Sequence, residues 1–148
     1  MNTDNVSSRL GSTDLKVTRL GYGAARIDAI APDQAEGLLN TLLDEGITFI
    51  DTADCYGDSE ELIGRFLGNR MKECVLATKC GCLIVGETGE DYTGPVVANS
   101  IDRSLRRDRL IQALGSADLV LLAHVLDDRQ ADAVGRLVDE HVVEVGLA

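Results

Sequence analysis

The feature that most constrains the fold of this chain is a regular alternation of short apolar runs with longer stretches of helical period, from residue 19 onward. The apolar runs lie at residues 20–25, 48–53, 74–80, 119–124 and 142–148. Several are apolar at consecutive positions, which is typical of parallel strands covered on both faces. Alternation of this kind indicates β–α units around a parallel sheet. We therefore predict an α/β fold with about five parallel strands and intervening helices.

The stretches between the runs carry helix signals. Apolar residues at helical spacing predict a helix over residues 32–46, which begins at a proline and ends at a glycine. A second helix is predicted after Asp58, where Glu61 completes a capping-box pattern. Two further helices are predicted, one from about residue 95 and one around residues 134–138. Four helices would thus separate the five strands.

Two segments lie outside this alternation. The first 18 residues read as a small β-hairpin before the first strand of the sheet. Residues 81–94 form a glycine-rich stretch that directly follows a predicted strand, and in a β/α barrel such a loop lies on the face where substrates bind. A mobile insertion without a role is the alternative for this loop. No linker interrupts the chain, so we predict one domain over residues 1–148.

Charge and hydropathy exclude several function classes. The net charge is −11, and scattered acidic residues would repel nucleic acid and anionic membranes. The one dense basic cluster lies in a predicted helix among acidic residues and is interpreted as a solvated helix face; it comprises Arg103, Arg106, Arg107 and Arg109. The chain has no apolar run of 18 residues and no signal-peptide pattern at its start. We expect a cytoplasmic protein that binds no nucleic acid and no membrane.

The four cysteines do not form a metal-binding pattern. Cys80 and Cys82 are separated by one residue, whereas a zinc site usually has two, and neither a second pair nor a nearby histidine completes the set. We expect no metal site. Free or buried thiols in a reducing compartment are the better interpretation.

Three segments resemble one known enzyme family. The stretch GITFIDTADCYGDSEELIG at residues 46–64 closely resembles the aldo-keto reductase signature. RLGSTDLKVTRLGYGAA at residues 9–25 is similar to the opening hairpin and first strand of that family, and CVLATKCG at residues 74–81 is similar to its third strand. The resemblance implies the N-terminal half of a (β/α)8 TIM barrel. It also implies an NAD(P)H-dependent oxidoreductase that reduces an aldehyde or ketone to an alcohol.

The resemblance implies a catalytic tetrad, which here is Asp51, Tyr56, Lys79 and His124. A phenol with a pKa near 10 is a poor acid at neutral pH unless a neighbouring group stabilises the phenolate. Lys79 would do so and Asp51 would hold Lys79 in place, so that Tyr56 acts as the general acid. His124 would point a ring N–H at the substrate oxygen.

Each of these residues has a simpler alternative. Asp51 could be a turn-forming residue at a strand end, and Lys79 could reach solvent at the rim or pair with a carboxylate. His124 could merely cap its strand, because residues 108–116 extend the approach to that strand beyond the family pattern. His141 precedes the last predicted strand, at the opposite face of the barrel, and is not a candidate.

The cofactor expected from the resemblance is NADPH or NADH, bound at its nicotinamide end by Gly23, Ala24, Ala25 and Asp51. A full barrel has eight strands and about 250 residues, so five strands predict a truncated barrel with little of the phosphate site. Exposed sheet edges then predict self-association or a complementing half-barrel. A catalytically inactive half-barrel remnant or binding protein is the alternative function. The expected partner is a small carbonyl substrate.

Overall fold

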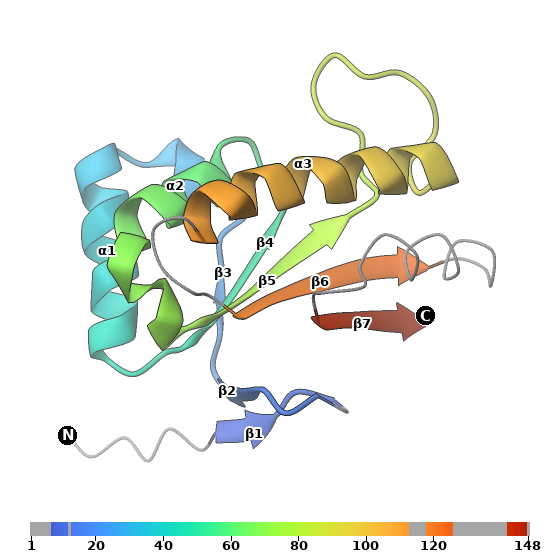
Figure 1. Ribbon diagram of the computed structural model, residues 1–148. Helices are drawn as coiled ribbons and strands as arrows, with labels where there is room; N and C mark the ends of the chain where they lie inside the picture. The colour runs from blue at the N-terminus through green and yellow to red at the C-terminus, as the bar shows by residue number, and fades with distance from the viewer. Residues whose placement is uncertain (1–6, 12, 113–117, 126–141, 148) are drawn as a thin grey trace.

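The computed structural model describes residues 7–11, 13–112, 118–125 and 142–147 (Figure 1). Five parallel strands form one sheet in the order of the sequence. These strands are β3 (Tyr22–Gly23), β4 (Phe49–Ala53), β5 (Val75–Cys80), β6 (Asp118–Val125) and β7 (Val142–Leu147). Each predicted apolar run therefore contributes a strand, and neighbouring strands in the sequence are neighbours in the sheet. The prediction of about five parallel strands is confirmed.

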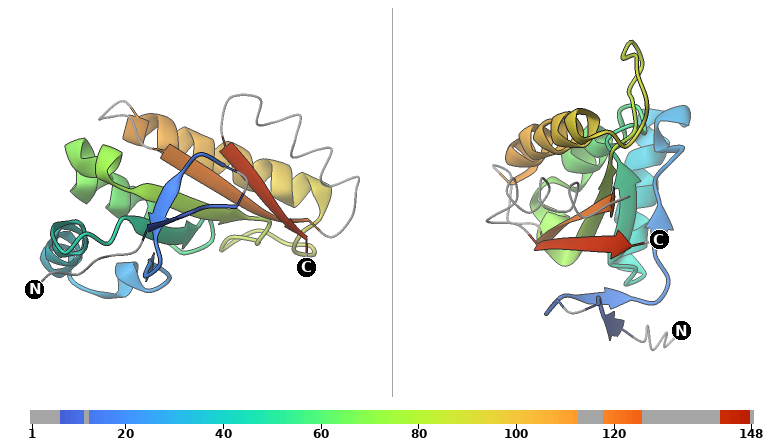
Figure 2. Two further views of the ribbon diagram at one scale, coloured as in Figure 1. Left: turned by 90° about the horizontal axis from the view of Figure 1, so that it is seen from below. Right: turned by 90° about the vertical axis from the view of Figure 1, so that its right-hand side faces the viewer.

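Three α-helices lie along the outer side of this sheet (Figure 2). They are α1 (Pro32–Asp44), α2 (Ser59–Leu67) and α3 (Gly94–Gln112), with short 3-10 turns at η1 (Ile27–Ala29) and η2 (Gly68–Glu73). α3 continues past residue 108, so part of the extended approach to β6 is additional helix. The helix predicted around residues 134–138 lies outside the described residues.

The second helix begins differently from the prediction. Asp58 is its N-cap residue, but the Asp58 side chain makes no capping hydrogen bond. The N–H of Ser59 instead donates to the carbonyl of Tyr56 at 3.0 Å. The turn after β4 thus satisfies this helix end with a backbone carbonyl, and the predicted capping box is wrong. The predicted stop at Gly68 is confirmed, since Gly68 is the C-cap with φ +40°.

The predicted N-terminal hairpin is present as β1 (Ser7–Arg9) paired antiparallel with β2 (Lys16–Thr18). Buried Val17 packs with Val75 and Ala77 of β5, and Phe49 of β4 packs against this cluster. Phe49 and Val75 begin their strands, so the hairpin covers the amino ends of the sheet. The carboxyl ends, where barrel enzymes place their sites, stay clear of it.

The main core fills the space between the sheet and its helices. Ile50 of β4 and Leu76 of β5 point into it and are at most 2% exposed. Each helix contributes a buried stripe of apolar side chains at helical spacing: Leu39, Leu43, Ile63, Leu67, Val97 and Ile101. Side chains alternate along a strand. In β4 from Ile50 to Ala53, and in β5 from Leu76 to Cys80, successive side chains therefore point alternately into this core and to the inner face of the sheet.

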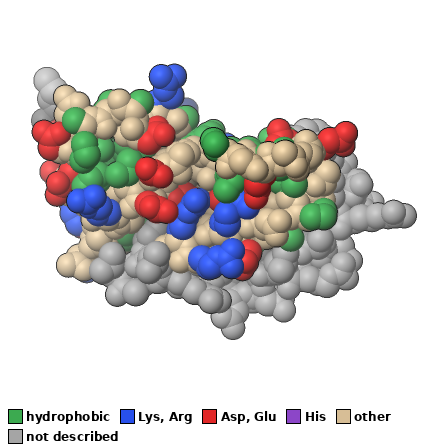
Figure 3. Space-filling model, turned by 90° about the horizontal axis from the view of Figure 1, so that it is seen from above, with side chains coloured by type: hydrophobic (Ala, Val, Ile, Leu, Met, Phe, Trp, Pro, Cys, Tyr) green, Lys and Arg blue, Asp and Glu red, His purple; other side chains and the backbone are tan. Residues whose placement is uncertain are grey.

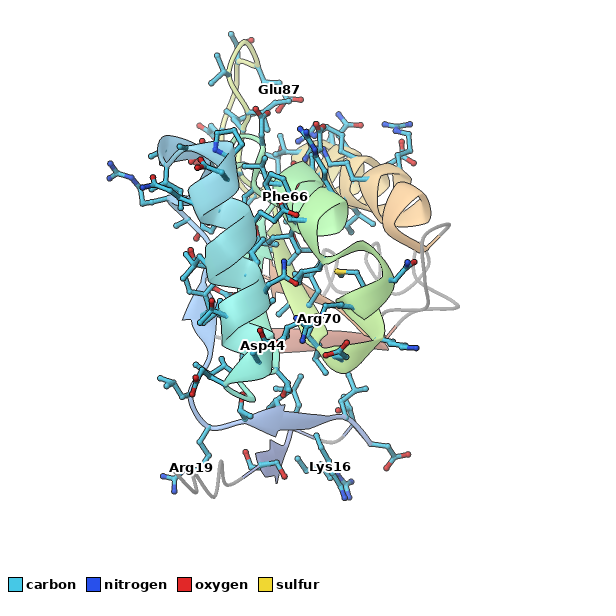
Figure 4. All side chains as sticks on the ribbon, turned by 90° about the vertical axis from the view of Figure 1, so that its left-hand side faces the viewer. Lys16, Arg19, Asp44, Phe66, Arg70 and Glu87 are labelled. Carbon is cyan, nitrogen blue, oxygen red and sulfur yellow. The ribbon has the colours of Figure 1, made fainter. Side chains whose placement is uncertain are left out.

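An exposed ion-pair cluster joins η2 to the C-terminal end of α1. Arg70 of η2 points toward the end of α1, where its guanidinium lies 2.9 Å from Asp44 (Figure 4). Arg70 also pairs with Glu73 at 2.9 Å and donates to the Asn40 side chain at 3.1 Å. These contacts tie η2 to α1 on the side of the molecule opposite to the strand carboxyl ends.

Within the described residues, no helix is both long and apolar enough to cross a membrane. In that same part of the chain, no group of three or more His, Cys, Asp and Glu residues is arranged to hold a metal ion. All four cysteines are free thiols; Cys74 and Cys80 are buried, whereas Cys55 and Cys82 are partly exposed.

Candidate active site at the strand ends

An ion pair between Asp51 and Lys79 lies at the carboxyl end of the sheet. Asp51 lies in β4 and Lys79 in the adjacent β5, where Lys79 is in register with Ala53. Both side chains point away from the helices, because the alternate positions Ile50 and Leu76 fill the core. The Lys79 ammonium contacts both Asp51 carboxylate oxygens, at 2.5 and 2.6 Å, and donates to the Thr52 carbonyl at 3.2 Å. Since its charge is matched at short range, Lys79 has a fixed position.

Tyr56 lies beside this pair, in the turn that connects β4 to α2. Its N–H donates to the Ala53 carbonyl at 3.0 Å, which closes the turn. The Lys79 ammonium lies 5.4 Å from the centre of the Tyr56 ring, within the range of a cation–π contact. The turn requires Gly57, which has φ +54° and lies so close to the Asp28 carboxylate that a Cβ atom would clash with it.

The first strand of the sheet completes this surface. Gly23 pairs with Asp51 in the sheet, and the N–H of Ala24 donates to the Asp51 carbonyl at 2.8 Å. Ala24 is fully buried, whereas Gly23 and Ala25 are exposed. A Cβ atom added to Gly23 would meet nothing within 4 Å. The surface at Gly23, beside the ion pair, is therefore open and has room for a flat ring.

His124 lies in β6, the next strand of the sheet. It follows Ala123, which is in register with Cys80, the residue after Lys79. The backbone of His124 is thus at the same end of the sheet as Lys79, but its side chain lies outside the described residues, as does all of His141. The structure brings Asp51, Lys79 and Tyr56 together and places the His124 backbone on the neighbouring strand.

A second group of charged residues, not anticipated from the sequence, lies between α2 and α3. Asp54 directly follows β4, and its side chain is only 1% exposed. It accepts hydrogen bonds from Ser100 at 2.8 Å, from Arg103 at 2.6 Å and from Arg107 at 2.8 Å. The hydrogen bond to Asp54 raises the pKa of Arg103. Asp54 therefore anchors α3 to the strand end that carries the Asp51–Lys79 pair.

Glu60 extends this buried network on the first turn of α2. Its carboxylate accepts from Thr78 of β5 at 2.6 Å, from Ser104 at 2.8 Å and from Arg107 at 2.8 Å. The side chain of Glu60 is 5% exposed, so each of these partners replaces water that burial has removed. We call the set Asp54, Glu60, Arg103 and Arg107 the interhelix network.

This network corrects the interpretation of the basic cluster as a solvated helix face. Arg106 does pair with Asp102 on the surface, at 2.6 Å. Arg103 and Arg107, however, are only 16% and 21% exposed and point between the helices. Figure 3 shows basic and acidic side chains next to each other on the upper face of the molecule. The signal for this arrangement is Ser100 and Ser104, small polar residues one helical turn apart on the same face as buried Ile101.

The glycine-rich loop after β5 is connected to the same network. Glu87 in this loop accepts from Arg103 at 2.8 Å, and it also accepts the N–H of Ile84 at 3.1 Å. A groove of about 560 Å³ lies between the loop and the start of α3, lined in part by Glu87, Thr93 and Val96. The groove is separate from the Asp51–Lys79 pair. Arg103 thus links the loop to Asp54 at the end of β4.

Comparison with known proteins places this geometry in a family. The model of the Aldo/keto reductase family matches residues 19–130. L-galactose dehydrogenase from Arabidopsis thaliana is 34% identical over 110 residues, which are 68% of this chain and 34% of that protein.

Solved structures agree with the sequence match. A putative aldo-keto reductase from Pseudomonas aeruginosa superposes with a TM-score of 0.76 and 27% identity, over 97% of this chain and 60% of that one. The holo form of an aldo-keto reductase from Bacillus halodurans gives a TM-score of 0.73 and 28% identity, over 96% of this chain and 49% of that one. The chain spans about a third of the plant relative and about half or more of the solved structures. The predicted partial (β/α)8 barrel is confirmed, and the chain belongs to the aldo-keto reductase family.

Proposed function

We propose that this chain carries the proton-donating side of an NAD(P)H-dependent oxidoreductase that reduces a small aldehyde or ketone to an alcohol. The observation that carries the proposal is the contact of Lys79 with both Asp51 and the Tyr56 ring. Family membership supports oxidoreductase chemistry in general, and the family generally uses NAD(P)H.

In this proposal Tyr56 donates the proton and Lys79 makes that donation possible. As a carbonyl is reduced, negative charge develops on its oxygen, and a proton from the Tyr56 hydroxyl neutralises it. The phenolate that remains is stabilised by the nearby Lys79 ammonium. Asp51 holds the ammonium through two short contacts, so the charge does not need to move during the reaction.

The remaining residues bind and orient. NAD(P)H would supply the hydride when it is bound. Gly23, Ala24, Ala25 and Asp51 would hold its nicotinamide end, because Gly23, Ala25 and Asp51 border the open surface beside Tyr56 and buried Ala24 joins them. His124 would donate a ring N–H to the substrate oxygen from the neighbouring strand.

The test is carbonyl reduction by the purified chain, measured from NADPH consumption with a generic aldehyde. Tyr56→Phe removes only the hydroxyl, and Lys79→Met removes only the ammonium from a chain of similar length. Each should lower turnover by about 10²- to 10⁴-fold, the usual contribution of general acid catalysis. The matched control is Lys72→Met, an exposed lysine on η2, which should leave turnover unchanged.

Two further readouts separate this proposal from the alternative of a non-catalytic half-barrel. NADPH binding is followed by fluorescence titration, and size by chromatography in the same buffer, because edge strands favour association. Saturable binding with turnover that both site variants abolish supports the reductase. Binding without turnover, or no binding up to millimolar NADPH, leaves the non-catalytic protein as the correct description.

A further inference from the structure

Two cysteines lie next to each other at the carboxyl end of the sheet, outside the chemistry proposed above. Cys55 lies in the turn after β4, directly before Tyr56, and Cys82 lies two residues beyond the end of β5. The two chain segments leave the sheet side by side, because the N–H of Asp54 donates to the carbonyl of Lys79 at 3.1 Å. Both thiols are partly exposed, so small molecules in solution reach them.

The two side chains are in hydrogen-bond contact. The Cys55 and Cys82 side chains share a hydrogen bond, and the Tyr92 side chain makes a second one with Cys82. Tyr92 is held in place by its backbone, which has φ +60° and donates its N–H to the Gly81 carbonyl at 2.7 Å. The Tyr92 ring also packs on Gly81, where a Cβ atom would approach it to 2.6 Å. The loop thus fixes Cys82 against Cys55.

The surroundings give the two sulfurs different roles. Burial, followed by the hydrogen bond with Cys82, raises the pKa of the Cys55 thiol to about 12. The electrostatic interaction with Cys82 is also the largest cause of the raised pKa of Tyr92. Cys55 therefore stays protonated at neutral pH, and both Cys55 and Tyr92 contact the Cys82 sulfur. This arrangement favours Cys82 as the sulfur that attacks first, because the thiolate is the nucleophile in thiol chemistry.

We propose that Cys55 and Cys82 form an oxidation site that reacts with small peroxides to give an intramolecular disulfide. The Cys82 thiolate attacks one peroxide oxygen; the O–O bond breaks, the other oxygen leaves as hydroxide or alkoxide, and Cys82 becomes a sulfenic acid. The Cys55 sulfur then attacks the Cys82 sulfur, the S–O bond breaks and water leaves with the thiol proton. Two electrons pass from the sulfur pair to the peroxide.

The disulfide would connect the turn that carries Tyr56 to the segment that follows Lys79. It would also remove the Cys82 sulfur from its hydrogen bond with Tyr92, which anchors the glycine-rich loop. If the proposed reductase function holds, oxidation changes turnover and a thiol reductant restores it. The oxidation site itself does not depend on that function, because it is detected on the protein alone.

The test is oxidation of the reduced, folded chain with dilute hydrogen peroxide, followed by alkylation and tryptic peptide mapping. Of the four thiols, two should be lost together and should return on reduction with dithiothreitol. Cleavage at lysine and arginine places Cys55 in peptide 27–65, Cys74 in peptide 73–79, and Cys80 with Cys82 in peptide 80–103. The expected product is a cross-link between peptides 27–65 and 80–103 that also forms in Cys80→Ser, which identifies Cys82 as the partner.

Single substitutions then separate the roles. Cys82→Ser should slow the first thiol loss by about tenfold or more, because the attacking thiolate is gone. Cys55→Ser should leave a sulfenic acid on Cys82 that a dimedone probe labels. Cys74→Ser, which removes a buried thiol, should react like the unchanged chain. A folded chain that keeps all four thiols, or that cross-links through Cys74, Cys80 or a second chain instead, overturns the proposal.

Discussion

Two groups of acidic and basic side chains lie within a few residues of each other in this molecule and differ in their contact with water. Asp51 and Lys79, at the strand ends, are 34% and 39% exposed. Asp54, three residues after Asp51, is 1% exposed and is bound by Ser100 and two arginines. Side chains alternate along β4 and into the residue that follows it, so Asp51 points to the open inner face and Asp54 points toward the helices.

This difference in exposure decides what each group contributes, either charges accessible for chemistry or stability of the fold. An exposed pair gains little free energy from its contact, because water screens the charges and competes for them. A buried carboxylate that loses its partners is left without solvation, so its removal or isolation is costly. The strand-end pair is therefore free to take part in chemistry, whereas the interhelix network holds the elements that position it.

The largest expected effect on stability comes from Asp54→Ala. This change leaves Arg103 and Arg107 partly buried without one of their carboxylates, and it should lower the free energy of unfolding by about 3–5 kcal/mol. The measurement is urea unfolding followed by circular dichroism. Asp102→Ala, which breaks only the exposed pair with Arg106, is the matched control and should cost less than about 0.5 kcal/mol. Equal losses in the two variants would show that burial does not distinguish them.

A smaller effect is expected from Glu60→Gln. Glutamine keeps the size of the side chain and one acceptor oxygen for Thr78 and Ser104, but it removes the charge that pairs with Arg107. Arg107 retains Asp54, so the loss should be about 1–3 kcal/mol. The urea midpoint of Glu60→Gln should then lie between those of Asp54→Ala and the unchanged chain. A midpoint below that of Asp54→Ala would make Glu60 the centre of the network.

The fold and the grouping of Asp51, Tyr56 and Lys79 were largely predictable from the sequence for local reasons. Apolar runs and helical spacing are properties of neighbouring residues, and the signature at residues 46–64 carries Asp51 and Tyr56 together. Lys79 ends an apolar strand, where a charged residue needs a partner, and the structure supplies Asp51. Of the two alternatives for Lys79, the structure shows the pairing with a carboxylate and not a side chain that only reaches solvent at the rim.

The interhelix network was not predictable in the same way. Its ion pairs join residues 47 to 53 positions apart, such as Asp54 and Arg107, and depend on how α3 packs beside α2. An arginine at helical spacing is compatible with a solvated face or with a side chain that reaches between helices. Which of these two arrangements forms depends on how α3 packs against α2. The capping box at Asp58 is also absent, because the Asp58 side chain makes no hydrogen bond to the first turn of α2.

Lys79→Met tests how much the exposed strand-end pair contributes to stability. Although it should abolish the proposed reduction, it should lower the free energy of unfolding by no more than about 1 kcal/mol, because both partners are more than one-third exposed. The same urea experiment provides this value, so activity and stability are compared on one preparation. A loss as large as that of Asp54→Ala would mean that the strand-end pair is structural, and the loss of turnover could then no longer be assigned to chemistry.

The smallest expected effect is at the exposed Arg70–Glu73 pair. The hydrogen bond from Arg70 lowers the pKa of Glu73 in the folded chain. A lowered folded pKa favours the ionised form, so the stabilisation is fully present above the ordinary pKa of a glutamate and is lost as the pH falls through the lowered value. Glu73→Gln should therefore unfold at slightly lower urea than the unchanged chain at neutral pH, with the two midpoints converging in acid. Because protonated glutamate and glutamine have the same charge, a difference that persisted unchanged in acid would come from packing and not from the ion pair.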